Sequence, residues 1–205
     1  MKVLAEIAAR SSPGLRTGTL RRSDLEAYSG LLEELPDARC FLVTGYGSER
    51  RSGAVGLAAT AAAAGSRTAL LECDLAEPGL ADALGLANAP GLHEYLLGTA
   101  DPETILRPVV LAGPGSAEAT EPLVCAVAGR PADDSWPLLA SDRFRRAIEG
   151  IRAAYEFVVI EGPPLRDEYA LRAVLGLADA TLLCVGPGES RRNLSIPVTG
   201  LVVLG

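Results

Sequence analysis

The chain has 205 residues, 48% of them hydrophobic and 4% aromatic, and a formal net charge of −7. This size and composition predict a single α/β domain with a sizeable core. The acidic balance argues against a nucleic-acid-binding surface, which would be basic. No apolar stretch approaches the roughly 20 residues of a membrane span. We therefore expect a cytoplasmic domain that reaches a membrane only through a partner.

The N-terminal region differs in character from the rest of the chain. Residues 1–36 are predicted to form an arm followed by a helix, and residues 37–205 to form the main domain. The arm carries a basic cluster whose members are Arg10, Arg16, Arg21 and Arg22. Ser, Pro, Gly and Thr interrupt this cluster, which favours a solvated arm over docking to anionic lipid or to an acidic partner.

A strand, a turn and a helix follow in the next segment. Residues 41–45 are apolar, Gly47 lies in the turn, and an alanine-rich helix is predicted over residues 52–64. This layout is typical of a phosphate-binding loop, G-x-x-x-x-G-K-[ST], with Gly45 and Ser52 at its first and last positions. Arg50 stands in place of the second glycine and Arg51 in place of the lysine. For this loop alone, a turn without any ligand is about equally favoured.

Both replacements have physical consequences for a nucleotide. Arg50 adds strain and bulk where the backbone would close around phosphate oxygens. Arg51 keeps a positive charge, but its planar fork differs from the compact ammonium group of lysine. Gly45, Gly47, Arg50, Arg51 and Ser52 are the candidate residues for binding a nucleotide.

Two further apolar strands end in carboxylates. Residues 67–72 lead to Glu72 and Asp74, and residues 157–161 end at Glu161. The carboxyl ends of parallel strands meet at one edge of the sheet, so we expect these three side chains to converge near the loop. They are the candidate catalytic residues, vestigial or weak. With Ser52 they would also hold Mg²⁺ if a nucleotide binds. An acidic residue after a strand is, on its own, more often a simple strand terminus.

Strands that alternate with helices predict a three-layer α/β/α architecture around a doubly wound, mostly parallel sheet. Residues 112–137 are rich in Gly, Pro, Ala and Asp and are interpreted as a surface excursion with a short strand at 123–128. Trp136 is expected to anchor this loop.

The ordered motifs resemble the cytoplasmic domain of bacterial tyrosine kinases, the polysaccharide co-polymerase kinases of the MinD/ParA family of P-loop ATPases. Residues 48–52, Ser-Glu-Arg-Arg-Ser, stand where that family has G-E-G-K-[ST], and residues 72–78 stand where it has D-x-D-x-R-x-P. Residues 161–164, Glu-Gly-Pro-Pro, correspond to its D-x-P-P. The stretches 26–28, 90–98 and 138–144 also resemble family segments, and Ser141 is predicted to cap a helix.

This resemblance implies ATP and Mg²⁺ as cofactors, although the altered residues leave open that no cofactor binds. It implies a membrane polysaccharide co-polymerase or related inner-membrane protein as partner, and self-association through the helix at residues 26–32. Ser29 and Leu32 occupy the arginine positions of that helix. The family's tyrosine-rich tail is not found, and Leu204 and Gly205 lie where an asparagine would meet the adenine.

Three functions remain open from the sequence. The first is a catalytically impaired homologue of the kinase that regulates or scaffolds exopolysaccharide or capsule production. The second is an active ATPase or tyrosine kinase with a divergent site, and the third is a MinD/ParA-like positioning protein.

Without Mg²⁺, three converged carboxylates would repel one another, and arginine can replace the charge of the metal. We therefore predict that Arg50 or Arg51 forms a salt bridge to Glu72, Asp74 or Glu161.

Overall fold

The computed structural model describes residues 2–7, 22–109, 123–186 and 196–204. Their strands form one sheet in the order β1-β8-β7-β2-β6-β3-β5-β4. All neighbouring strands are parallel except β4, which runs antiparallel to β5. The elements in chain order are β1 (Val3–Ile7), α1 (Arg22–Glu34), β2 (Cys40–Gly45), α2 (Glu49–Ala63), β3 (Thr68–Glu72), α3 (Leu80–Leu84), α4 (Leu92–Leu97), α5 (Pro102–Ile105), β4 (Leu106–Val109), β5 (Leu123–Ala126), α6 (Trp136–Leu139), α7 (Asp142–Ala154), β6 (Phe157–Glu161), α8 (Glu168–Leu175), β7 (Ala180–Val185) and β8 (Gly200–Leu204).

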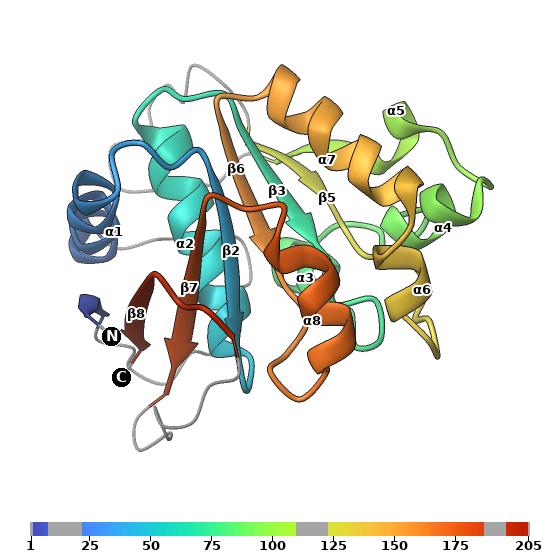
Figure 1. Cartoon of the computed structure of the whole chain (residues 1–205). Coiled ribbons are helices and arrows are strands. Elements are labelled where there is room, and N and C mark those ends of the chain that lie inside the picture. The colour runs from blue at the N-terminus through green and yellow to red at the C-terminus, as the bar shows by residue number, and fades with distance from the viewer. Residues whose placement is uncertain (1, 8–21, 110–122, 187–195, 205) are drawn as a thin grey trace.

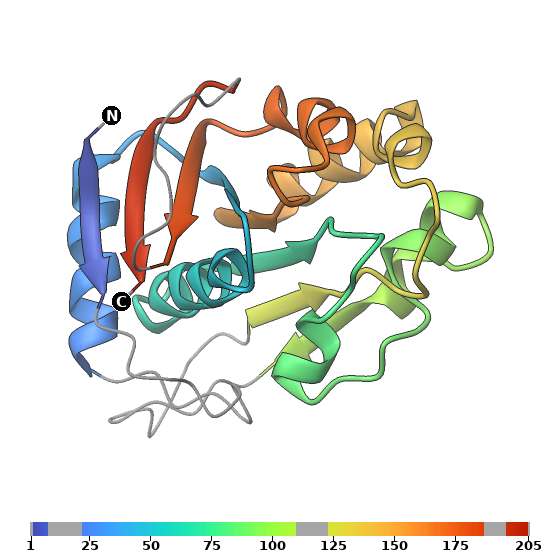
Figure 2. The same ribbon diagram turned by 90° about the horizontal axis from the view of Figure 1, so that it is seen from below.

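Helices cover both faces of the sheet (Figures 1 and 2). Successive residues of a strand point to opposite faces, and β2 shows the pattern clearly. Phe41 and Val43 pack with α1, α2 and α3 on one face. Cys40 and Leu42 pack with α4, α6, α7 and α8 on the other. Because both faces are covered, β2 is buried along its whole length, as expected for a parallel strand. The predicted three-layer fold is confirmed.

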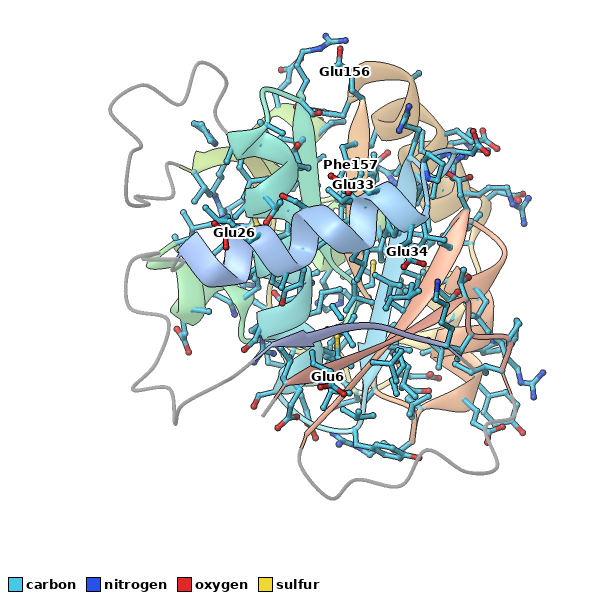
Figure 3. All side chains as sticks on the ribbon, turned by 90° about the vertical axis from the view of Figure 1, so that its left-hand side faces the viewer. Glu6, Glu26, Glu33, Glu34, Glu156 and Phe157 are labelled. Atoms are coloured by element: carbon cyan, nitrogen blue, oxygen red, sulfur yellow. The ribbon has the colours of Figure 1, made fainter. Side chains whose placement is uncertain are left out.

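Helix α1 packs onto α2 through an aromatic contact. Tyr28 is buried, and a Cβ at Gly56 would collide with its ring, so glycine at position 56 lets the two helices approach closely. Leu32, at one of the family's arginine positions, packs against the core instead of facing solvent. Figure 3 shows the outer side of α1, which carries the exposed residues Glu26, Glu33 and Glu34.

The structure departs from the sequence analysis in three elements. Residues 123–126, interpreted as a short strand within a surface excursion, form β5, a buried strand that pairs with β3 and β4 inside the sheet. Residues 3–7, which we assigned to the arm, form strand β1 at the sheet edge, paired with β8. Helix α2 begins at Glu49, three residues before the predicted start. The remainder of the arm, with Arg10, Arg16 and Arg21, lies outside the described residues, as does Gly205. Within the described part of the chain, no helix is both long and apolar enough to span a membrane.

Candidate functional site

The ends of three central strands form the site. Strand β6 lies between β2 and β3, and the register places Glu72 beside Glu161. The side chains of Glu72, Asp74 and Glu161 are all buried. The predicted convergence of the three carboxylates at the C-terminal edge of the sheet is therefore confirmed.

The loop after β2 is wound into the start of α2. The backbone N–H groups of Arg51 and Ser52 both donate to the carbonyl oxygen of Ser48, at 3.0 and 3.2 Å. In a phosphate-binding loop, such N–H groups point at phosphate oxygens. Here the first turn of the helix uses them, which also explains why α2 begins earlier than predicted.

Two glycines of this loop are closely packed against other groups of the protein. A Cβ at Gly45 would collide with the carbonyl oxygen of Cys184 on β7. A Cβ at Gly47 would collide with the carboxylate of Glu49, which folds back over the loop. One oxygen of that carboxylate, Oε2, is buried without a hydrogen-bond partner. Glycine at position 45 is thus explained without a ligand, whereas the flexible end of the Glu49 side chain could move away from a Cβ at position 47.

Arg50 connects three segments of the site. Its guanidinium donates to the carbonyl oxygen of Gly47 at 2.6 Å and to that of Gly162 at 3.2 Å. A third nitrogen donates to Asp74 in an ion pair, and Arg50 as a whole is only 4% exposed. The side chain is therefore built into the interior, between the loop after β2, the loop after β3 and the turn after β6.

Arg51 lies on the outer side of the same cluster. Its Nε is 3.2 Å from Oε1 of Glu161, and one terminal nitrogen is 3.8 Å from Oε1 of Glu72. The guanidinium lies against Gly79, where a Cβ would leave it no room. The predicted pairing of an arginine with the converged carboxylates is confirmed, and it involves both arginines.

Glu72 is held by the backbone. One of its carboxylate oxygens accepts hydrogen bonds from the N–H groups of Gly79 and Leu80, at 2.5 and 2.7 Å. The other accepts from the N–H of Ala128 at 2.9 Å. Glu72 thereby satisfies N–H groups at the start of α3 and ties them to the segment that follows β5. Glu72 therefore has a structural role, because its carboxylate fixes the loop between β3 and α3.

Glu161 has the most unusual environment of the three carboxylates. It is buried, and neither of its oxygens has a hydrogen-bond partner. Burial raises its pKa to about 8; Arg51 opposes the shift and Glu72 adds to it. Burial also raises the pKa of Asp74, against the effect of Arg50. Two arginines face three carboxylates, so a single proton on Glu161 makes the cluster neutral.

This protonation predicts a pH-dependent stability. Folded Glu161 keeps a proton that the unfolded chain releases near pH 4.5, so the free energy of unfolding should fall as the pH rises from about 4.5 to about 8. The limiting slope is about 1.4 kcal/mol per pH unit. Glu161→Gln should remove this component, as measured by urea unfolding at several pH values. Exposed Glu149→Gln is the control. Parallel curves for wild type and Glu161→Gln would contradict the assignment.

The side chains as placed do not fit a magnesium nucleotide. Arg50 fills the interior of the loop, the N–H groups of Arg51 and Ser52 are engaged, and both oxygens of Glu72 accept from the backbone. Among the described residues, no group of three or more His, Cys, Asp or Glu side chains is arranged to hold a metal ion. The predicted set of Mg²⁺ ligands, Ser52, Glu72, Asp74 and Glu161, remains a hypothesis for a rearranged state.

Some parts of the site escaped the sequence analysis. The carbonyl groups of Gly47 and Gly162, which hold Arg50, carry no signal in the sequence. The backbone role of Glu72 was also missed, because a glutamate after a strand gives no sign of which groups it contacts. Trp136, expected to anchor its loop, is instead 47% exposed.

The fold is the three-layer α/β/α arrangement that is also found in P-loop ATPases such as MinD. The MinD protein of Pyrococcus horikoshii, solved with Mg-ADP, matches 72% of this chain and 57% of its own, with a TM-score of 0.51 and 19% identity. Bacterial tyrosine kinase domains match more of the chain. The kinase domain of Escherichia coli Etk has a TM-score of 0.80 and 18% identity, covering 100% of this chain and 90% of its own.

Two further comparisons agree with this resemblance. The chimerical protein CapA2B2 has a TM-score of 0.80 and 18% identity, over 98% of this chain and 93% of its own. In sequence, the succinoglycan biosynthesis transport protein ExoP of Rhizobium meliloti (strain 1021) is 31% identical over 166 residues. These are 74% of this chain but 19% of ExoP, so the chain spans about a fifth of that relative. No protein-family profile matches the chain. The resemblance to bacterial tyrosine kinase domains is confirmed.

Proposed function

We propose that this domain is a catalytically impaired relative of the bacterial tyrosine kinases whose nucleotide pocket is filled by its own arginine side chains. The buried guanidinium of Arg50, held by Gly47, Gly162 and Asp74, carries the proposal. A guanidinium in this place supplies the positive charge that a bound metal would bring to the carboxylates. The cluster therefore holds its loops together without a cofactor.

The domain would then act by contact, as a regulatory or scaffolding partner in exopolysaccharide production. The sequence similarity to ExoP, a succinoglycan biosynthesis transport protein, supports this setting. The partner would be a membrane polysaccharide co-polymerase or a related inner-membrane protein. The domain would be cytoplasmic and would reach the membrane through that partner.

An active ATPase or kinase with a divergent site is the second candidate. Arg51 favours it, because its side chain is 19% exposed whereas that of Arg50 is 5% exposed. Arg51 could therefore turn toward a phosphate at a lower cost than Arg50, which is bound on three sides. An active site would still require Arg50 to leave Asp74.

A titration with Mg-ATP separates the two candidates. We expect no saturable binding by calorimetry up to about 1 mM nucleotide. A dissociation constant of about 1 mM corresponds to a binding free energy of only about −4.1 kcal/mol. Dissociation constants in the micromolar range would overturn the impaired-enzyme proposal and promote the active one.

A genetic test addresses the non-catalytic role. In a strain deleted for the gene, Glu161→Gln should restore polymer yield as fully as wild type, because the proposal assigns Glu161 no chemical step. Failure of a stably accumulated Glu161→Gln protein to complement would argue for catalysis.

A further inference from the structure

A second concave site lies away from the two arginines. It is a cavity of about 360 Å³ lined by Asp133, Asp134, Ser135, Trp136, Asp167 and Tyr169. Helices α6 and α8, which follow β5 and β6, lie side by side around it (Figure 1). The cavity is therefore outside the carboxyl ends of parallel strands, where open α/β sheets commonly take their ligands.

Two aromatic side chains stand at this cavity. Trp136 is 47% exposed and Tyr169 is 74% exposed, although rings of this size are usually covered. Their ring centroids are 6.5 Å apart and the ring planes meet at 71°, an edge-to-face contact. Exposed aromatic faces attract cations through their negative π surfaces.

The negative charge of the cavity also favours a cationic ligand. Asp133, Asp134 and Asp167 contribute three carboxylates, and no arginine, lysine or histidine of the described residues forms an ion pair with any of them. Asp167 is fixed in place: it accepts from the N–H of Ala170 at 3.1 Å and from the hydroxyl of Ser135 at 3.1 Å. The other two aspartates are exposed. In the site at the strand ends, by contrast, Arg50 and Arg51 supply cations to the carboxylates.

We propose that this cavity binds an arginine side chain presented by a basic peptide segment of a partner protein. A guanidinium can lie flat on an aromatic ring while its fork meets a carboxylate, which an ammonium group cannot do. Trp136 and Tyr169 supply the rings, and Asp133 and Asp134 supply exposed acceptors. Asp167 adds negative charge from a fixed position.

The site is physically linked to the arginine cluster but does not depend on it. The N–H of Ala132 donates to the carbonyl oxygen of Leu75 at 2.8 Å, joining the segment before the cavity to the loop that carries Asp74. The residues that line the cavity are different from the candidate nucleotide-binding residues at the strand ends. Loss of peptide binding and a positive Mg-ATP titration are therefore independent results.

The test uses a fluorescein-labelled peptide, Gly-Ser-Arg-Gly-Arg-Ser-Gly, read by fluorescence anisotropy on the full chain. We expect saturable binding that weakens roughly ten-fold in the double variant Asp133→Asn/Asp134→Asn, the loss of about one charge-assisted hydrogen bond. Tyr169→Ala should weaken it by about three-fold or more through the lost cation–π contact. Because all three residues are exposed, these variants should unfold at the wild-type temperature.

Matched controls separate a specific site from general charge attraction. Glu103→Gln/Glu149→Gln removes two exposed negative charges elsewhere and should bind as wild type does. A citrulline peptide, neutral but of the same shape, should bind at least about ten-fold more weakly.

Four results would overturn the proposal: no saturable binding to about 1 mM, equal weakening in the control variant, equal affinity for a lysine peptide, or equally tight binding of free arginine amide. The last would point to a small cation as the occupant in place of a peptide segment.

Discussion

Arg50→Met is expected to lower the free energy of unfolding by about 3–5 kcal/mol, the usual cost of breaking a buried ion pair by removing one partner. Asp74 would be left buried without its cation, and the carbonyl oxygens of Gly47 and Gly162 would lose a donor. Urea unfolding at pH 8 gives the value. The loss should be smaller at pH 5, because Asp74, whose pKa burial already raises, can then take up a proton.

Two comparisons isolate the role of the buried pair. Arg130→Met breaks an ion pair with Glu94 in which the arginine side chain is 79% exposed, and should cost less than about 1 kcal/mol. The double variant Arg50→Met/Asp74→Leu should recover much of the loss, because apolar residues often replace buried ion pairs without penalty. If Arg50→Met is no more destabilising than Arg130→Met, Arg50 does not join the loops as described.

The double change Arg50→Gly/Arg51→Lys is expected to create nucleotide binding, which the proposed function denies to the parent. Glycine removes the guanidinium from the loop interior, and lysine brings a compact ammonium group that can reach between phosphates. In a calorimetric titration with Mg-ADP, we expect a dissociation constant at least about ten-fold below the 1 mM limit. This corresponds to a gain of about 1.4 kcal/mol in binding free energy.

The single variant Arg51→Lys is the control for this repair. It keeps Arg50 in contact with Gly47, Gly162 and Asp74, so it should bind no better than wild type. If the repaired double variant also binds no better, the guanidinium of Arg50 is not the main obstacle. The segment expected to meet the adenine base would then be the larger defect.

Much of the fold could be predicted because its signals are local. The strands ending at Gly45, Glu72 and Glu161 are short apolar runs followed by turn residues, and the structure places all three side by side. Ser141 was likewise predicted as a helix cap, and its hydroxyl accepts from the N–H of Phe144 at 3.1 Å. Strand β1 was missed because its five residues are a strand only through pairing with β8, far away in the chain.

The candidate site was predictable in its charges but not in its contacts. Opposite charges at neighbouring strand ends indicated a contact between an arginine and a carboxyl group, and both arginines make one. Which carboxylate each arginine meets depends on the backbone around it. Glu72, for example, is occupied by the N–H groups of Gly79, Leu80 and Ala128, which leaves Asp74 as the partner of Arg50.

The three-way attachment of Arg50 also constrains how this domain could acquire a nucleotide site through single substitutions. A first step from Arg50 to glycine would leave Asp74 buried and uncompensated before any lysine was present to hold a phosphate. A first step from Arg51 to lysine would leave the pocket filled. Each one-step path therefore passes through a protein that is less stable or no better at binding. Selection for stability would therefore keep Arg50 in place.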